Sequence, residues 1–441
     1  MEAVLARLPR VALLQRGFLL GLVVLFLALS VQYGLKARDG GSAIVRWRNQ
    51  LLSLENENIY SQFAYPNPPI MALLLSPIAN MPPLLGALLW FYLRAGMAVG
   101  SLLCFFAIIE TPEKPFPLWA KNLTIILSLR PVMGDLTHGN VNLFILFLVA
   151  LGLYAFHQRR DYVAGLSIAL AIACKVTPAL FIPYFLYKRA WKTLAGISLG
   201  LVLFLIIIPS LFLGFGRNWE LLHSWTDQMV TPFLVDGVVT SEHQNQSLPG
   251  LLYRLTTVSP SFIDWENSTS TFHNLVTLNV TTVKWILKGC MLAFSVLVIW
   301  CCRTPIKSRQ GWRLAAEFSI VLLGMLIFSE RTWKHHCVTF LAPFAVISYY
   351  LAVCRPGRGL QITLITLLSL ALISMASSST SLLSFDAKMA QVYGAYLWTM
   401  CLLAAALFII LRQPDAPALA NPEVLSDKKL DGATILHGVG A

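Results

Sequence analysis

Residues 38–69 read R-D-G-G-S-A-I-V-R-W-R-N-Q-L-L-S-L-E-N-E-N-I-Y-S-Q-F-A-Y-P-N-P-P, a polar run between two strongly apolar segments. The run holds Asp39, with Arg38, Arg46 and Arg48 close by in the sequence. A carboxylate among guanidinium groups at a membrane surface has two interpretations. It belongs either to a solvated loop between membrane helices or to a general base beside an anion site. The rest of the sequence decides between them.

The composition is that of an integral membrane protein. The 441-residue chain is 57% hydrophobic and 12% charged, with a mean hydropathy of +0.68. Soluble domains carry about 25% charged residues, so a soluble protein is excluded. The net charge of +12 is spread between apolar stretches, which does not indicate nucleic-acid binding. The eight cysteines show no metal-ligand spacing, so we expect neither a disulfide framework nor a zinc site.

Apolar runs of the length that crosses a bilayer, about 20 residues, recur along the chain. They predict an all-α polytopic bundle of about ten to twelve transmembrane helices in a single domain, residues 1–412, followed by a polar, disordered cytoplasmic tail over 413–441. The clear spans are 11–31, 84–109, 139–156, 193–213, 280–302, 313–329, 337–353, 359–378 and 391–411.

Three other apolar regions are short or broken. Residues 68–79 suit a partial helix, 118–130 are barely long enough to cross, and 162–187 are interrupted at Lys175-Val-Thr-Pro178. Broken helices at membrane depth require protein or a wet cavity to satisfy the freed backbone groups. The breaks therefore indicate a cavity.

Lysine and arginine clusters predict the orientation. They fall at connections that alternate onto one face, which the positive-inside rule assigns to the cytoplasm: Arg159-Arg160, Lys188-Arg189-Lys192, Arg303 to Arg313, and Arg355/Arg358. The opposite, external face receives the connections 32–68, 130–139, 175–178, 214–279, 329–336 and 379–390. Polar residues that topology does not explain gather on this external face, which predicts a site there.

Two motifs on that face lie at helix ends. The run Arg130-Pro-Val-Met-Gly-Asp135-Leu-Thr-His138-Gly-Asn140-Val-Asn142 places charged and amide groups at the mouth of an apolar helix. N-capping explains one asparagine, but not Arg130, Asp135 and His138 as well. A lysine inside an apolar span, here Lys175, indicates a functional site, with snorkelling to the interface as the alternative.

Two further motifs carry hydrogen-bonding groups. Ser241-Glu-His243-Gln-Asn245-Gln246-Ser offers amides and hydroxyls that suit a sugar, although a solvated loop tip has the same composition. Ser329-Glu330-Arg331-Thr-Trp333-Lys334-His335-His336 combines imidazoles with two cations. Because adjacent histidines on a helix point about 100° apart, a phosphate clamp is favoured over a metal site. No nucleotide-binding loop is present, which argues against ATP or a nucleotide sugar.

The order of these motifs resembles that of glycosyltransferase family 87. Members of this family are polyprenyl-phosphate-mannose-dependent mannosyltransferases of the GT-C fold, and the family was formerly classified as a domain of unknown function. The resemblance covers about residues 11–411. The motifs that carry it are Asp39, Tyr65-Pro66-x-Pro68-Pro69, Arg130-Pro131, Gly139-Asn140-Val141-Asn142, Lys175-x-Thr-Pro178, Asn245-Gln-Ser-Leu248 and Ser329-x-x-x-Trp333-x-His335-His336.

The resemblance implies a membrane-embedded, inverting transfer of a hexose, mannose in the family, from a polyprenyl-phosphate donor to a lipid or glycan acceptor on the external side of the inner or plasma membrane. Asp39 is then the catalytic base, with Asp135, Glu242 and Glu330 as alternatives. The expected donor-phosphate ligands are Arg130, Lys175, Arg331, His335 and His336. The expected substrate contacts are Tyr65, Asn140, Asn142, His243, Asn245, Gln246 and Trp333.

The expected partners are the bilayer, the lipid-linked donor and a glycolipid or glycan acceptor. We expect no cofactor. The sequence leaves a divalent metal open but favours its absence, because the acidic residues lack the clustering that a hard cation requires. The competing class is a transporter or flippase of lipid-linked sugars, which shares broken helices and a lysine at membrane depth. That class predicts polar residues facing both sides or a repeat symmetry, and the sequence shows neither.

Overall fold

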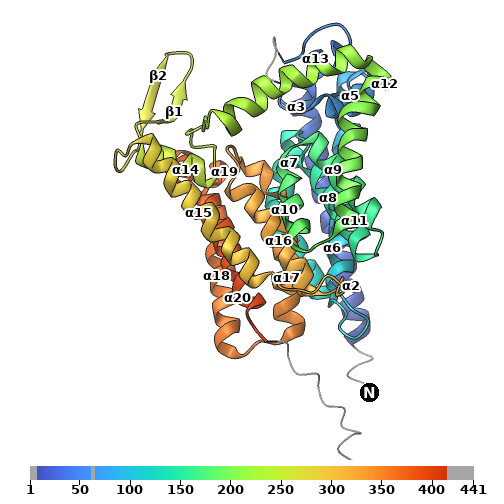
Figure 1. Cartoon of the computed structure of the whole chain (residues 1–441). Helices are drawn as coiled ribbons and strands as arrows, with labels where there is room; N and C mark the ends of the chain where they lie inside the picture. The colour runs from blue at the N-terminus through green and yellow to red at the C-terminus, as the bar shows by residue number, and fades with distance from the viewer. Residues whose placement is uncertain (1–6, 61–64, 415–441) are drawn as a thin grey trace, which may run out of the picture.

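A computed structural model describes residues 7–60 and 65–414 (Figure 1). The predicted tail from residue 413 therefore lies almost wholly outside the described residues. The helices are α2 (Arg7–Arg38), α3 (Ala43–Arg46), α4 (Arg48–Leu52), α5 (Pro69–Ala79), α6 (Pro83–Ile109), α7 (Leu118–His138), α8 (Asn142–His157), α9 (Asp161–Cys174), α10 (Phe181–Tyr187), α11 (Trp191–Val202), α12 (Ile208–Leu213), α13 (Phe215–Trp225), α14 (Leu248–Thr256), α15 (Val280–Cys301), α16 (Trp312–Ile327), α17 (Leu341–Tyr349), α18 (Arg358–Ser377), α19 (Thr380–Val392) and α20 (Ala395–Leu411). Shorter 3-10 or π-helical turns are Thr177–Leu180, Leu203–Ile207, Thr226–Val235, Lys334–Phe340 and Tyr350–Cys354.

The protein is an all-α polytopic membrane protein, as predicted. Six helical segments in the described part of the chain are long and apolar enough to cross a membrane, or seven if α19 and α20, bent by 56°, count as one span. This number is below the predicted ten to twelve because α8, α9 and α16 have only 16, 14 and 16 residues. The six are Ala12–Arg46, Pro83–Ile109, Trp191–Leu213, Val280–Cys301, Lys334–Cys354 and Arg358–Ser377.

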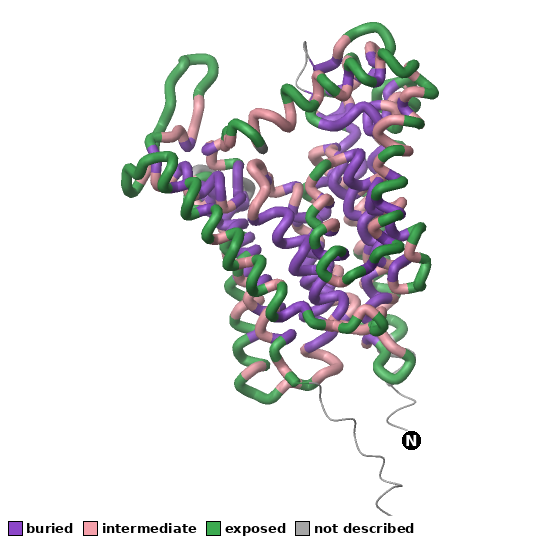
Figure 2. Tube along the Cα trace, in the orientation of Figure 1, coloured by how far each residue is buried: buried purple, intermediate pink, exposed green. Residues whose placement is uncertain are grey.

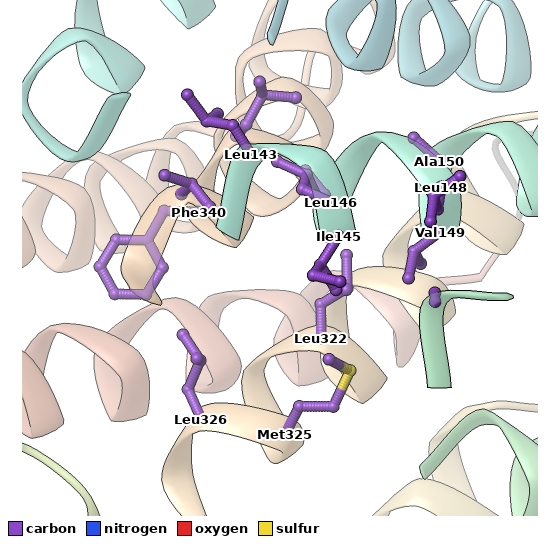
Figure 3. Packing of buried hydrophobic residues seen from close by; sticks show 14 of the residues in the cluster. Leu143, Ile145, Leu146, Leu148, Val149, Ala150, Leu322, Met325, Leu326 and Phe340 are labelled. Carbon is purple, nitrogen blue, oxygen red and sulfur yellow. The ribbon is translucent and has the colours of Figure 1, made fainter. Parts of the chain in front are cut away.

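The short helices form the interior and the long helices form the outer wall. Within the span Lys334–Cys354 the most apolar window is 78% buried, whereas that of α15 is only 11% buried. Figure 2 shows the same contrast between the buried centre and the exposed outer helices. At the centre, Ile145 and Leu146 of α8 face Leu322 and Met325 of α16 (Figure 3). Exposed apolar side chains on α2, α15 and α18 face outward, where a bilayer requires them.

Small residues allow the closest helix packing, between α9 and α11. A Cβ on Gly165 would meet the carbonyl oxygen of Thr193 and the backbone of Gly196. Glycine at such positions lets two membrane helices approach until their backbones touch, and this contact gains van der Waals energy that lipid cannot replace. The pair fixes the helix whose end carries Lys175.

Two of the three predicted short or broken helices are confirmed. Helix α9 ends at Cys174, Lys175 is extended (φ −160°, ψ 122°), and a 3-10 turn with Pro178 in its first positions leads into α10. Proline favours the first turn of a helix because its missing N–H is not needed there. Helix α5 begins at Pro69 for the same reason and is too short to cross.

Two predicted boundaries were wrong. Helix α7 does not stop near Arg130 but continues through Pro131 to His138, where Gly139 adopts φ +82°. An interior proline removes one backbone hydrogen bond, but α7 packs against Lys334–Phe340 and α17, and these contacts hold the helix together. The predicted loop 214–279 contains α13, α14 and an antiparallel hairpin of β1 (Pro260–Asp264) and β2 (Thr269–Phe272).

The predicted basic clusters gather at one end of the bundle. Arg159 donates to the carbonyl of Lys307, Lys188 to those of Cys302 and Thr304, and Arg313 to that of Leu411. These carbonyls lie at or just beyond helix C-termini, where cations are favoured. Helix α13 and the hairpin lie at the opposite end (Figure 1).

Candidate functional site

A cavity of about 640 Å³ collects most of the polar segments that the sequence placed on the external face. Six stretches of the chain meet around it, from the end of α3 to the turn that follows α16. The residues that line it are Arg46, Trp47, Pro66, Asn67, Pro68, His138, Asn140, Lys175, Val176, Thr177, Leu180, Trp225, Met229, Val230, Phe233, Gly324, Met325, Phe328, Ser329, Glu330, Arg331, Trp333, His335 and His336.

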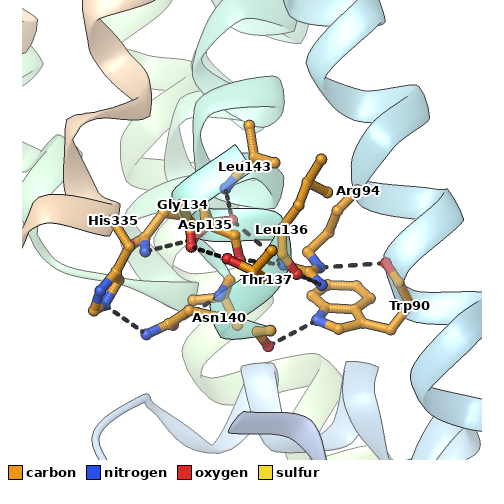
Figure 4. A network of polar contacts seen from close by, with 12 residues as sticks. Trp90, Arg94, Gly134, Asp135, Leu136, Thr137, Asn140, Leu143 and His335 are labelled. Atoms are coloured by element: carbon orange, nitrogen blue, oxygen red, sulfur yellow. Dashed lines mark hydrogen bonds and ion pairs between the residues drawn. The ribbon is translucent and has the colours of Figure 1, made fainter. Parts of the chain in front are cut away.

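Three histidine rings contact one another beside the cavity. The rings of His138 and His335 are parallel, with centroids 4.1 Å apart, and the ring of His336 stands edge-on to His335 at 4.7 Å. The amide nitrogen of Asn140 lies 3.1 Å from Nε2 of His335 (Figure 4). An amide N–H₂ can only donate, so Nε2 of His335 is the acceptor and its proton sits on Nδ1.

His336 has the opposite tautomer. Its Nδ1 accepts the backbone N–H of Trp333 at 3.2 Å, which places the proton of the neutral ring on Nε2. The structure thus offers imidazole N–H donors beside a cavity that also contains Lys175 and Arg331. Donors and cations of this kind suit the oxygen atoms of a phosphate.

The two predicted cations of the cavity are held in different ways. The Lys175 ammonium donates to Oδ1 of Asn142 at 2.6 Å. The Arg331 guanidinium donates through Nε to Oγ1 of Thr240 at 3.2 Å and lies 5.3 Å from the centre of the Phe233 ring. Both side chains are partly buried, so charge on a ligand is screened less there than at the protein surface.

The remaining wall is apolar. Leu180, Met229, Val230, Phe233 and Phe328 line it, from the 3-10 turn, the π-helical segment Thr226–Val235 and the end of α16. Cations and imidazoles thus share one cavity with an apolar surface. An amphipathic ligand with an anionic head matches this division.

The four carboxylates that were candidate bases differ in their exposure and in their position relative to the cavity. The Asp39 side chain is 73% exposed, pairs with Arg38 at 3.8 Å and does not line the cavity. Glu330 is the one carboxylate among the described residues that line it. Asp135 is fully buried in an ion pair with Arg94 at 3.5 Å. Glu242 is not among the lining residues.

Several predicted substrate contacts lie elsewhere. Tyr65 is fully buried against Trp47, and Asn142 is buried and does not line the cavity. Asn245 donates to the carbonyls of Thr240 and Glu330, and Gln246 donates to those of His243 and Gln391. These amides hold loops together, because their hydrogen-bonding groups are directed at the backbone.

Two other predicted ligands also lie outside the cavity lining. Arg130 donates to the hydroxyl of Tyr396 at 3.4 Å. His243 packs on Phe262 of the hairpin, with ring centroids 4.5 Å apart, and burial lowers its pKa. The structure therefore brings together Asn140, Lys175, Arg331, Trp333, His335 and His336 of the predicted set.

Sequence reasoning missed Arg94, which is fully buried beside Asp135 (Figure 4). A charged residue within the span 84–109 was the available signal, because such residues are costly in a membrane unless paired. It also missed Arg46 as a wall residue. Among residues 7–60 and 65–414, no group of three or more His, Cys, Asp or Glu side chains is arranged to hold a metal ion.

The fold and the cavity define a class, a multi-pass membrane protein with an amphipathic, cationic site at one end of its bundle. The sequence model of glycosyltransferase family 87 matches residues 65–329, more than half of the 441-residue chain. The chain belongs to this family.

Two curated relatives are similar over part of the chain. Both are named polyprenol-phosphate-mannose-dependent alpha-(1-2)-phosphatidylinositol mannoside mannosyltransferase. The protein from Mycolicibacterium smegmatis is 28% identical over 255 residues, covering 56% of this chain and 50% of the relative. The protein from Mycobacterium tuberculosis is 25% identical over 247 residues, covering 54% and 49%. The chain thus spans about half the length of the curated relatives that it matches.

Proposed function

We propose that the protein transfers mannose from a polyprenyl-phosphate-mannose donor to a glycolipid or glycan acceptor on the external side of the inner or plasma membrane. The observation that carries the proposal is the division of the cavity, with Lys175, Arg331 and imidazole groups against an apolar wall. A lipid-linked sugar phosphate has the same division, an anionic diester next to an isoprenoid chain. The names of the two relatives support the donor, and suggest a mannosylated phosphatidylinositol as acceptor.

The reaction needs one base and several cations. The acceptor hydroxyl oxygen attacks the anomeric carbon of mannose, its proton passes to the base, and the bond from that carbon to the phosphate oxygen breaks with inversion. The leaving polyprenyl phosphate carries negative charge, so groups that stabilise an anion lower the barrier more than a general acid does. Lys175, Arg331, His335 and His336 fill that role.

We assign the base to Asp39. Residues near it in the sequence contact segments of the cavity wall: Lys36 donates to the carbonyl of Thr137, next to His138, at 3.0 Å, and Arg46, a wall residue, donates to that of Gly41 at 3.1 Å. Its open position suits an acceptor that arrives from outside the bundle. Glu330 is the alternative, because it lies inside the cavity.

A donor panel tests the proposal. Protein in lipid nanodiscs is supplied with radiolabelled polyprenyl-phosphate-mannose, polyprenyl-phosphate-glucose or a nucleotide-linked mannose, together with a total glycolipid extract. We expect label in the glycolipid fraction only from the first donor. Label that moves across the bilayer without a new glycosidic bond would instead establish a transporter of lipid-linked sugars.

A further inference from the structure

A chain of buried polar contacts runs from Arg94 in α6 to the cavity. The Arg94–Asp135 ion pair is the first link of this chain, and its role extends beyond stabilising the fold. We propose that Arg94 and Asp135 are positioning residues, which act through Asn142 to hold the Lys175 ammonium against the bound phosphate. This inference rests on the proposed function for the identity of the ligand, but the geometry of the chain is independent of it.

The chain has three links. Arg94 Nη1 lies 3.5 Å from Oδ2 of Asp135, and both side chains have no exposed surface. Oδ1 of Asp135 accepts from the amide nitrogen of Asn142 at 2.9 Å. Oδ1 of Asn142 accepts from the Lys175 ammonium at 2.6 Å, and Lys175 lines the cavity.

The chemistry of the links fixes their direction. An ionised carboxylate only accepts hydrogen bonds, so the Asn142 amide must turn its nitrogen toward Asp135. Its oxygen then points to Lys175, which only donates. A reversed amide would set two donors against each other at Lys175 and two acceptors against each other at Asp135. The carboxylate thereby determines which group the lysine meets.

Arg94 holds the other side of the arrangement. Its guanidinium donates to the carbonyls of Asp135 and Leu136 at 2.8 and 3.1 Å, in the last turn of α7 (Figure 4). Trp90, one helical turn earlier in α6, donates from its indole to the carbonyl of Gly139 at 3.2 Å. These contacts fix the turn from which His138 and Asn140 reach the cavity. The buried Arg94–Asp135 pair therefore positions both Lys175 and the turn that carries His138 and Asn140.

The protein contains a matched pair that does not lead to the cavity. Glu317, fully buried in α16, binds Lys188 at 2.7 Å and the hydroxyl of Tyr184 at 2.8 Å. The Lys188 ammonium also donates to the carbonyls of Cys302 and Thr304, at the basic end of the bundle. A purely structural role predicts similar consequences for breaking either pair. A positioning role predicts that breaking the Arg94–Asp135 pair affects donor binding and Lys175, whereas breaking the Lys188–Glu317 pair does not.

The first test is kinetic. Asp135→Asn leaves position 135 able to donate to Asn142, so the Asn142 amide reverses and the lysine is released. We expect the KM for polyprenyl-phosphate-mannose to rise and kcat/KM to fall roughly tenfold, which corresponds to the loss of one charged hydrogen bond. Asn142→Leu removes the same link without leaving Arg94 unpaired, and it serves if the first variant does not fold. Glu317→Gln keeps the donor KM of the wild type.

A double-mutant cycle separates positioning from a general loss of packing. When Lys175→Met is already present, the additional effect of Asp135→Asn on KM should nearly vanish. Full additivity of the two changes overturns the proposal, because it shows that Asp135 acts independently of the lysine.

The second test needs no transferase activity. Lys175 in folded protein is labelled with a small amine-reactive reagent and quantified by mass spectrometry. We expect faster labelling of Lys175 in Asp135→Asn and Asn142→Leu, and the wild-type rate in Glu317→Gln. Unchanged labelling in both site variants overturns the positioning role. Faster labelling in a protein that does not use the mannose donor keeps the positioning role and rejects the proposed function.

Discussion

Replacing Lys175 by methionine removes the one ammonium that reaches the cavity from the break between α9 and α10, while keeping an unbranched stem of similar size. In the structure this ammonium donates one hydrogen bond, at 2.6 Å to Asn142 Oδ1, and Lys175 lines the cavity with Arg331 and three histidines. We expect Lys175→Met to weaken binding of the donor diester in a protein that still folds.

The magnitude follows from the bond that is lost. A hydrogen bond to a charged group contributes about 1.5–3 kcal/mol. Since about 1.4 kcal/mol corresponds to a factor of ten, kcat/KM should fall by roughly 10- to 150-fold. Partial burial of Lys175 keeps the effect largely present at high ionic strength, unlike that of an exposed charge. The unpaired Asn142 oxygen adds a stability loss of about 1–3 kcal/mol, which a thermal unfolding curve reports separately.

The assay measures initial rates of mannose transfer against donor concentration in nanodiscs, at low and high salt. Lys192→Met, which removes an exposed lysine at the start of α11, is the matched control and should leave the kinetics unchanged. A Lys175→Met enzyme with the wild-type kcat/KM for the donor would refute the reasoning. Lys175 would then be a structural lysine rather than a phosphate ligand.

Three further predictions concern Gly139, Arg254 and Arg331. Gly139→Ala should lower the unfolding free energy by about 1–3 kcal/mol, because φ of Gly139 is +82° and the added Cβ would lie 2.9 Å from the Tyr33 hydroxyl. The control Gly134→Ala adds its Cβ in open space on α7 and should leave the unfolding free energy unchanged. Equal losses of Tm in the two variants would contradict the prediction. Arg254→Met should cost more than about 3 kcal/mol, since this buried guanidinium donates to five carbonyls at 2.8–3.3 Å, and an unchanged Tm would contradict it. Arg331→Lys should raise the donor KM several-fold while leaving Tm unchanged, because lysine cannot reproduce the planar guanidinium that contacts both Thr240 and Phe233. A wild-type KM in this variant would contradict the prediction.

The sequence predicted the structure best where a polar or helix-breaking residue lies within an apolar, membrane-spanning segment. Lys175 followed by Pro178 predicted the break after α9 because neither residue is stable inside a straight apolar helix. The gathering of polar motifs on one face predicted a common cavity, and segments around Asn140, Lys175 and Trp333 meet there. These signals are local, so they are readable from one chain.

The remaining features depend on contacts between distant segments. Asn245 and Gln246 have the composition expected of a sugar site, yet their amides bind backbone groups, and composition does not distinguish the two uses. Arg94 finds its carboxylate 41 positions away, and only the packing of α6 on α7 brings the pair together. The hairpin β1–β2 was missed because its strands have only five and four residues, too short for a periodic pattern.

The central claim is that this chain transfers mannose from polyprenyl phosphate with Asp39 as base. Its most direct test is transfer of radiolabelled mannose from polyprenyl-phosphate-mannose to membrane glycolipids by the wild type, Asp39→Asn, and the control Glu57→Gln in the same polar run. We predict transfer by the wild type and the control, and a loss of at least about 100-fold in Asp39→Asn with normal expression. Full activity of Asp39→Asn would contradict the assignment and move the base to Glu330. No transfer by the wild type would contradict the claim itself.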